Sequence, residues 1–342
     1  MNKNKLILVI LLVFMTFNTT GCTHWLKDED GKIVKEPTTG QNLASDILCQ
    51  PTDKNVIKTY EKHDVDIKKL PTCEEFTPAS GGYTGIWSTL VVKPLTWLIN
   101  QVGMLIGNYG WAIILATILI RLIIFPLSRK AAQQSEGMRE AQKDLEKLQK
   151  KYRNRTDQEA QMMQAQEMMQ IYKKYNINPM SGCLFAFIQM PLFLAFLESL
   201  QKLPAVFEET FLGINLGTSP LVGMFDGKIS VSNFLAAFSS GDWVYIILPV
   251  LVALTTFYSF KMNTATGTPE QQQQMKMMMN FMTIFIIIAS FTMSSSIIIY
   301  WITGSIFTIV QNLMVRKRSE KKNVRSDKDR SKKPRRSIKV SA

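Results

Sequence analysis

The chain has 342 residues, with 40 Lys and Arg against 27 Asp and Glu, a net charge of +13 and 46% hydrophobic residues. A soluble protein of this length would form about two or three domains, but four nearly uncharged blocks here reach the roughly 20 residues that cross a bilayer. Both histidines, His24 and His63, precede these blocks, which excludes a Cys/His zinc site or a Ser/His/Asp triad within the membrane. No nucleotide-hydrolysis motif occurs, so we expect a polytopic membrane protein that is not an enzyme and uses no metal or cofactor.

Residues 1–22 have the composition of a secretory signal, with lysines at the start and an apolar core after them. The pair Gly21-Cys22 then resembles a bacterial lipobox, in which the cysteine is lipidated and becomes the mature N-terminus. This interpretation places the N-terminus outside the cell, anchored by lipid on Cys22. The alternative is an uncleaved signal anchor with an incidental cysteine.

Residues 23–85 are polar and rich in turn-forming residues, without a sustained helical or strand period. We expect a mostly irregular exported tether. The segment contains Cys49 and Cys73, which either form a disulfide outside the cell or remain two thiols.

Residues 86–107 are apolar enough to span the membrane, but their small and polar residues fall on one helical stripe. The stripe consists of Thr89, Lys93, Thr96, Asn100, Gly103 and Gly107. Pro94 interrupts the helical hydrogen bonds, and Trp87 and Trp97 can anchor a helix at the membrane surface. We therefore predict an interfacial amphipathic helix.

Five transmembrane helices are predicted from the remaining apolar blocks. They cover 108–127, 178–201, 243–261, 277–293 and 294–315. The sequence thus predicts an all-α polytopic membrane protein with an interfacial helix and a cytoplasmic helical hairpin.

Charge decides the orientation of these spans, because basic loops stay in the cytoplasm. Segment 128–177 and the tail 316–342 hold most of the bases, whereas 202–242 holds two, so that loop is predicted to be exported. The loop 262–276 then lies in the cytoplasm. A bacterial plasma-membrane protein with its N-terminus outside and its C-terminus inside satisfies every loop.

The segment 128–177 carries a heptad stripe typical of a coiled helical hairpin. Its members are Met138, Ala141, Leu145, Leu148 and Tyr152. A capping box at 156–159 begins the second helix. The hairpin is either a solvated connector or a docking surface, because its Met-rich face can adapt to partners.

The tail 316–342 is strongly basic and lacks aromatic residues, and we expect it to be disordered. Anionic lipid, ribosomal RNA and a simple positive-inside signal are all compatible with its charge. Its extent beyond the membrane favours the ribosome. We expect no specific DNA binding.

Arg121 lies well inside the first span, where an arginine costs about 2.5–3.5 kcal/mol on insertion scales. No acidic residue lies deep in another span. The side chain either snorkels to the cytoplasmic side, pairs with backbone carbonyls or faces a water-filled cavity, and its depth favours the cavity. Polar residues that can line it are Gln189, Thr292, Ser294, Ser295, Ser296, Tyr300, Trp301, Thr303 and Gln311.

At these residues the sequence resembles the YidC/Oxa/Alb membrane insertases. The matching stretches are Asn108-Tyr109-Gly110-Trp111 through Arg121 to Pro126, Asn178-Pro179 through Ile188-Gln189-Met190-Pro191 to Phe193, and Tyr300-Trp301 through Gln311. The resemblance covers about 86–315 and implies a hydrophilic groove that holds Arg121, with Gln189, Phe193, Tyr300 and Trp301 along the substrate path. The lipoprotein start and five spans look like the Gram-positive type, although 292–297 lacks the Pro-(Ala/Ser)-Gly-Leu turn frequent in the family.

The resemblance implies an insertase and foldase for nascent membrane proteins, acting alone or with the Sec translocon. The alternative is a small-solute or anion transporter that uses Arg121 as a binding charge, although internal repeats typical of transporters are not visible. A ribosome or membrane tether without insertion activity would leave Arg121 unexplained.

Overall fold

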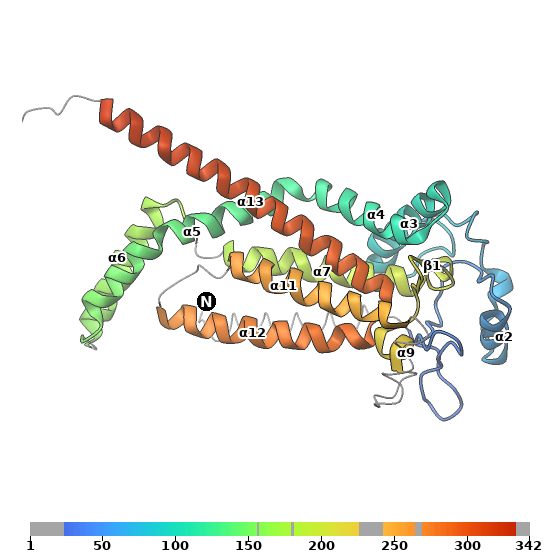
Figure 1. The fold of residues 1–342 in the computed structure, drawn as a ribbon. Coiled ribbons are helices and arrows are strands. Elements are labelled where there is room, and N and C mark those ends of the chain that lie inside the picture. Colours follow the sequence, from blue (N-terminus) through green and yellow to red (C-terminus); the bar gives the residue numbers. More distant parts are fainter. Residues whose placement is uncertain (1–23, 156, 179–180, 226–241, 264–268, 333–342) are drawn as a thin grey trace, which may run out of the picture. The chain divides into compact units, whose positions relative to one another are not determined.

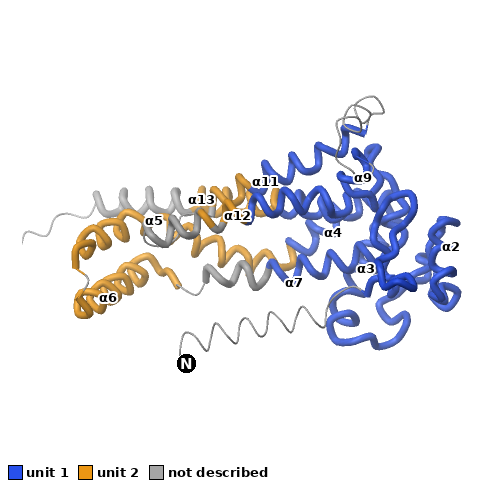
Figure 2. Tube along the Cα trace, turned by 90° about the horizontal axis from the view of Figure 1, so that it is seen from below, with its two compact units in different colours: residues 1–121, 188–256, 282–304 blue, residues 122–187, 257–281, 305–342 orange. Residues whose placement is uncertain are grey.

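The computed structural model describes residues 24–155, 157–178, 181–225, 242–263 and 269–332. The signal segment and Cys22 lie outside these residues. The described part is predominantly helical (Figure 1), as the sequence predicted, and its one two-stranded sheet is a short hairpin. The chain divides into two compact units, coloured in Figure 2. Unit 1 comprises 1–121, 188–256 and 282–304, and unit 2 comprises 122–187, 257–281 and 305–342.

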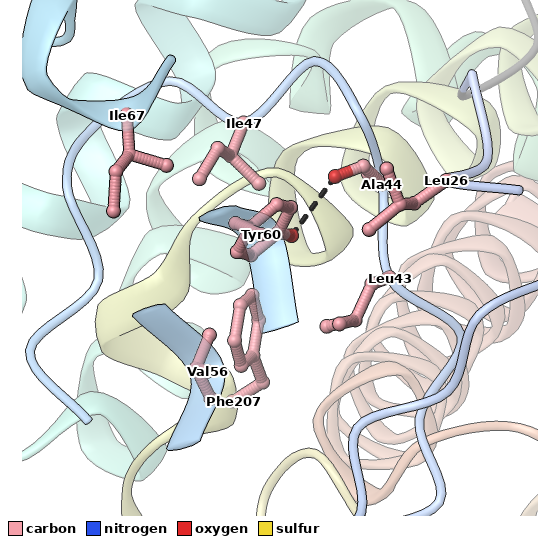
Figure 3. Close-up of a cluster of buried hydrophobic side chains, with 8 residues drawn as sticks. All are labelled: Leu26, Leu43, Ala44, Ile47, Val56, Tyr60, Ile67 and Phe207. Atoms are coloured by element: carbon pink, nitrogen blue, oxygen red, sulfur yellow. Dashed lines mark hydrogen bonds between the residues drawn. The ribbon is translucent and has the colours of Figure 1, made fainter. Parts of the chain in front are cut away.

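The N-terminal part of unit 1 has a hydrophobic core of its own (Figure 3). This core consists of Leu26, Leu43, Ala44, Ile47, Val56, Tyr60, Ile67 and Phe207. Helix α2 (Lys54–Lys62) begins at Asp53, whose carboxylate accepts the backbone N–H groups of Asn55 and Val56, and a 3₁₀ turn, η1 (Ile67–Lys69), follows. The Tyr60 hydroxyl donates to the carbonyl of Ala44 at 2.9 Å.

Residues 24–85 are mostly irregular in secondary structure, as expected, with α2 and η1 as the helical segments, but the expectation of a mere tether was wrong because the segment encloses a hydrophobic core. The local sequence lacks a helical or strand period, but its scattered apolar residues close around Phe207, which comes from helix α8 (Pro204–Phe207) far along the chain. A disulfide joins Cys49 and Cys73 beside this core. The exported location of the segment stays a prediction.

A π-turn, η2 (Ser88–Val92), leads into helix α3 (Lys93–Ile106), which ends at Gly107 in the left-handed conformation. The polar stripe is buried within unit 1 at Lys93, Thr96, Asn100 and Gly103. The Lys93 ammonium donates to the carbonyls of Ser80 and Gly82 at 2.8 and 2.6 Å. Pro94 is the second residue of α3 but lies within the continuous helix Ser88–Ile106, so it offers no N–H to the carbonyls of the preceding turn, as the sequence predicted.

Helix α4 (Tyr109–Ile123) and helix α5 (Phe125–Tyr152) are separated at Ile124, with Pro126 in the first turn of α5. Helix α7 (Ser181–Gln201) contains Pro191 and is followed by α8. Strands β1 (Thr210–Phe211) and β2 (Ile214–Asn215) pair in antiparallel register. The ring of Phe211 packs edge-on against Trp111 at 5.4 Å, so the hairpin covers the start of α4.

The later elements are α9 (Pro220–Phe225), the 3₁₀ turn η3 (Asp242–Ile246), α11 (Ile247–Asn263), α12 (Pro269–Thr292) and α13 (Ser295–Lys332). The predicted short connection between the last two spans is present. Serines stand where the family's Pro and Gly are absent, and they fix the turn by hydrogen bonds. The N–H and Oγ of Ser295 both donate to the carbonyl of Thr218, and the N–H of Ser296 donates to the carbonyl of Leu216.

Three helices in the described part of the chain are long and apolar enough to cross a membrane: Ser88–Ile106, Asp242–Met262 and Ser295–Arg318. A fourth span results if α4 and α5 are taken together, and Met279–Thr292 is a shorter apolar helix. These agree with the spans predicted at 243–261 and 294–315. The total of five, and the interfacial rather than spanning position of 86–107, stay predictions.

In unit 2, helix α6 (Gln158–Lys174) packs against α5. The predicted stripe forms the contact, since Ala141, Leu145, Leu148 and Tyr152 are all buried. The N-cap of α6 is Asp157, whose carboxylate accepts from the N–H of Ala160 at 3.0 Å, while Thr156 lies outside the described residues. Two ion pairs at 2.6 Å, Lys174–Asp144 and Lys151–Glu167, join the helices on their exposed sides.

The expectation of a disordered tail was wrong as far as Lys332, because α13 continues to that residue. No Gly or Pro occurs between Gly304 and Pro334, and Lys and Arg are good helix formers. The segment 316–332 is therefore a helical extension of about 25 Å at 1.5 Å per residue.

Candidate functional site

The candidate groove residues come from three helices and all belong to unit 1. Arg121 lies in the last turn of α4. Gln189 and Phe193 are one helical turn apart on α7, and Tyr300 and Trp301 lie in the first turns of α13. The structure brings together residues that the sequence separates by more than 100 positions.

The Arg121 side chain is buried, with 6% of its surface exposed. Its Nε atom has no hydrogen-bond partner in the described part of the chain. None of the ion pairs among the described residues includes it. The guanidinium lies against Gly304 of α13, where a Cβ would meet Nη2 at 2.7 Å.

Tyr300 lies beside this guanidinium and is almost fully buried. Its hydroxyl lies near the Gln189 side chain as well, yet it has no hydrogen-bond partner within the described residues. Arg121 Nε and Tyr300 Oη are thus both buried without a hydrogen-bond partner among the described residues. Leaving such groups unpaired is costly, so water or an arriving polar group that bonds to them here would be stabilised.

Aromatic rings complete the site. Phe193 packs edge-on against Trp301 with ring centroids 5.1 Å apart, and its centroid lies 6.4 Å from that of Tyr300. The Trp301 indole N–H donates to the hydroxyl of Thr256 on α11 at 3.3 Å. The site combines a buried cation with an apolar wall.

Glu198, the carboxylate near the predicted outer end of the second span, is bound to residues other than Arg121. Glu198 is buried and pairs with Lys202 at 3.2 Å, and it accepts the indole N–H of Trp87 at 3.2 Å. Lys202, which follows α7, also pairs with Asp46 at 2.7 Å and so ties residues 24–85, here called the N-terminal subdomain, to the end of α7.

Several other polar residues of the predicted lining bond to their own surroundings. Thr303 donates to the carbonyl of Ile299 and Thr292 to that of Ala289. Gln311 belongs to unit 2, where its Oε1 accepts from the Ser128 hydroxyl at 3.0 Å.

Sequence reasoning missed Phe196 and Gly304. Phe196 stacks on Tyr300 with centroids 4.2 Å apart. The spacing of Gln189, Phe193 and Phe196, by four and three, places all three on one face of α7 and could have revealed it. Gly304, one turn after Tyr300, gave no comparable signal, because its role depends on what faces it.

Two further predicted sites remain, and the structure describes one of them. The lipidation site Cys22 lies outside the described residues. The disulfide cysteine Cys73 connects to the start of α4, since its carbonyl accepts from the Asn100 amide at 2.5 Å and Asn100 accepts from the Tyr109 hydroxyl at 2.8 Å.

Several known membrane proteins are similar to this chain in sequence. The model of the family described as "60Kd inner membrane protein" matches residues 101–322. The membrane protein insertase YidC of Oceanobacillus iheyensis is 33% identical over 255 residues, which cover 72% of this chain and 91% of that protein. The membrane protein insertase MisCA of Bacillus subtilis is 34% identical over 257 residues, covering 75% and 89%. A crystal structure of an active YidC insertase aligns at 20% identity and a TM-score of 0.41, covering 76% of this chain and 53% of that one.

Proposed function

This chain belongs to the YidC/Oxa/Alb family, described as the 60Kd inner membrane protein family, and we propose that it is a membrane protein insertase whose substrate site is centred on Arg121. The site receives a polar, preferably acidic, exported end of a nascent membrane protein. Gln189, Phe193, Tyr300 and Trp301 contact the segment as it crosses. The observation that carries this proposal is the buried guanidinium without a carboxylate partner among the described residues.

The mixture of one cation and several rings supports a peptide client over a small anion. A solute anion is usually held by several converging donors, whereas Phe193, Tyr300 and Trp301 offer mainly apolar surface next to Arg121. An entering transmembrane segment presents both a polar end and an apolar helix, and each finds a matching part of the site.

The driving force in this proposal is burial of the client's apolar helix in the bilayer. Each square ångström of apolar surface removed from water contributes about 25 cal/mol, so a full span contributes many kcal/mol. The charge of Arg121 lowers the cost of bringing the polar end across. No nucleotide hydrolysis is required.

The finer topology belongs to the same proposal. The N-terminus lies outside, anchored by lipid on Cys22, and the basic helix 316–332 lies in the cytoplasm near the ribosome and anionic lipid. The Met-rich exposed face of α6, with Met162 and Met169 among its residues, is available to partners on the cytoplasmic side. The insertase acts alone or with the Sec translocon.

The test uses purified protein in liposomes and a single-span client with an acidic exported end. We expect Arg121→Ala to slow insertion about 10- to 100-fold, the range for losing a hydrogen bond to a charged group. A client whose acidic residues are replaced by their amides should depend much less on Arg121. Lys130→Ala removes an exposed charge of the adjacent helix and serves as the matched control.

Equal insertion of the acidic client by wild type and Arg121→Ala would contradict the proposal. In that case, anion uptake by client-free liposomes, lost in Arg121→Ala, would favour the transporter. Photocrosslinking from positions 189 and 301 gives an independent readout, with the lipid-facing position 119 as the control.

A further inference from the structure

The guanidinium of Arg121 lies in a notch in the surface of α13, the space left by the missing side chain of Gly304. A Cβ added to Gly304 would lie 2.7 Å from Nη2 and 3.5 Å from both Cζ and Nε of Arg121. A separation under 3 Å does not occur between a real Cβ and a heavy atom without displacement, so one of the two must give way. Among the glycines in the described residues, Gly304 is the one whose missing Cβ would meet a charged group so closely.

The position of the notch along α13 relates it to Tyr300. Residues four apart lie on the same face of a helix, so Tyr300 and Gly304 form consecutive levels of one face. The guanidinium lies against Gly304, one turn along this face from Tyr300. Its Nε is left without a partner among the described residues. A side chain at 304 would therefore occupy space that the guanidinium now fills.

The Arg121 guanidinium can move more easily than the α13 backbone at Gly304. It is the far end of a flexible side chain, whereas Gly304 is part of the backbone of a long helix. Alanine is also the better helix former, by about 1 kcal/mol in an interior position. An alanine at 304 would accordingly leave α13 intact and push the guanidinium aside.

We propose that Gly304 is a positioning residue that sets the place of the Arg121 guanidinium and thereby the preference for clients with acidic exported ends. This inference rests on the proposed function and deepens it. Gly304 itself contributes no charge and no donor side chain. It acts through the space that it leaves.

The experiment compares two clients that differ only in having acidic residues or their amides at the exported end. We expect Gly304→Ala to slow insertion of the acidic client about 3- to 10-fold, as for a side chain driven from its preferred rotamer. Insertion of the amide client should change by less than about twofold. Gly137→Ala is the matched control, since this glycine lies inside α5 with its nearest neighbours at an ordinary 3.4 Å, and it should not discriminate between the clients.

A double-substitution cycle with Arg121→Lys separates the guanidinium from general packing. Lysine has no second terminal nitrogen to meet the new methyl group. In the Arg121→Lys background, Gly304→Ala should therefore leave acidic-client insertion unchanged within about twofold and should raise the melting temperature. In the wild-type background it should not raise the melting temperature, because the displaced guanidinium offsets the gain in helix propensity.

Each result decides the inference. Equal slowing of both clients, or the same effect of Gly304→Ala in both backgrounds, overturns it. If Gly304→Ala fails to accumulate, rescue by Arg121→Lys supports the notch, and failure of the double variant overturns it. Should Arg121→Ala insert the acidic client normally, the proposed function itself fails, which is a result distinct from an unimportant Gly304.

Discussion

The ring of Phe196 stacks on that of Tyr300, with centroids 4.2 Å apart and planes inclined by 20°. Tyr300 is the residue that lies beside both Arg121 and Gln189. Its ring is held by Phe196 of α7. Phe196 thus supports the site through its contact with Tyr300.

Replacing Phe196 by leucine should loosen the Tyr300 ring while keeping the position apolar. An aromatic pair contributes about 0.5–1.5 kcal/mol beyond its buried area, so we expect a lower melting temperature and slower insertion of the acidic client. Thermal unfolding in detergent and client insertion in liposomes measure the two effects. Leu197→Met, next along α7 but outside this stack, is the control, and equal effects of the two substitutions would refute the supporting role.

The Cys49–Cys73 disulfide should stabilise the N-terminal subdomain. It closes a loop with a sequence separation of 24, for which chain entropy gives about 3–4 kcal/mol. Cys49→Ser/Cys73→Ser should make residues 24–85 more sensitive to limited proteolysis. A reductant should have the same effect on the wild type and none on the double variant. Protection that is identical in all samples would mean that the core around Tyr60 suffices without the bridge.

The α5–α6 hairpin should loosen at acidic pH. Lys174 donates a hydrogen bond to Asp144, and Tyr175 adds another, which lowers the pKa of that carboxyl below its usual value. Hydrogen bonds from Lys151 and Tyr152 likewise lower the pKa of Glu167. A carboxyl with a lowered pKa stabilises the folded state above its unfolded pKa of about 4, and this contribution is lost as pH falls through the folded pKa.

Spin labels on the exposed faces of α5 and α6 can follow this change. We expect a narrow distance distribution from pH 8 to pH 5 and a broader one below about pH 4. Asp144→Asn/Glu167→Gln should remove most of the pH dependence in the acid range. A distribution that broadens equally in this variant would assign the transition to other groups.

The basic extension of α13 should bind ribosomes through its charge and its helical form. Deleting 316–342 should weaken co-sedimentation most at low salt, because each phosphate contact releases counterions. Val324→Pro should break the helix within the extension at unchanged charge, with Val324→Ala as its control. Binding that is unaffected by the deletion would leave the tail as an orientation signal alone.

Local patterns determined much of this protein. The heptad stripe of 138–152 predicted the packing face of α5, because a period near 3.5 already places those residues on one side of a helix. Uncharged blocks predicted the apolar helices for a different reason, because about 20 consecutive apolar residues are long enough to cross a bilayer. The tail shows where composition misled, since a high charge was interpreted as disorder although the segment contains no residue that breaks a helix before Pro334.

Contacts between residues far apart in the sequence were decided by the tertiary structure, because the local spacing of residues does not specify them. The N-terminal segment folds because Phe207, about 140 positions after Ile67, completes its core. Glu198 is removed as a partner for Arg121 by Lys202 and Trp87.

The sequence by itself identified Arg121, because a charge inside an apolar block is visible as a local exception. It could not identify Gly304, because the importance of an absent side chain depends on what lies opposite. That neighbour comes from a helix more than 180 positions away, and only the folded chain brings the two together.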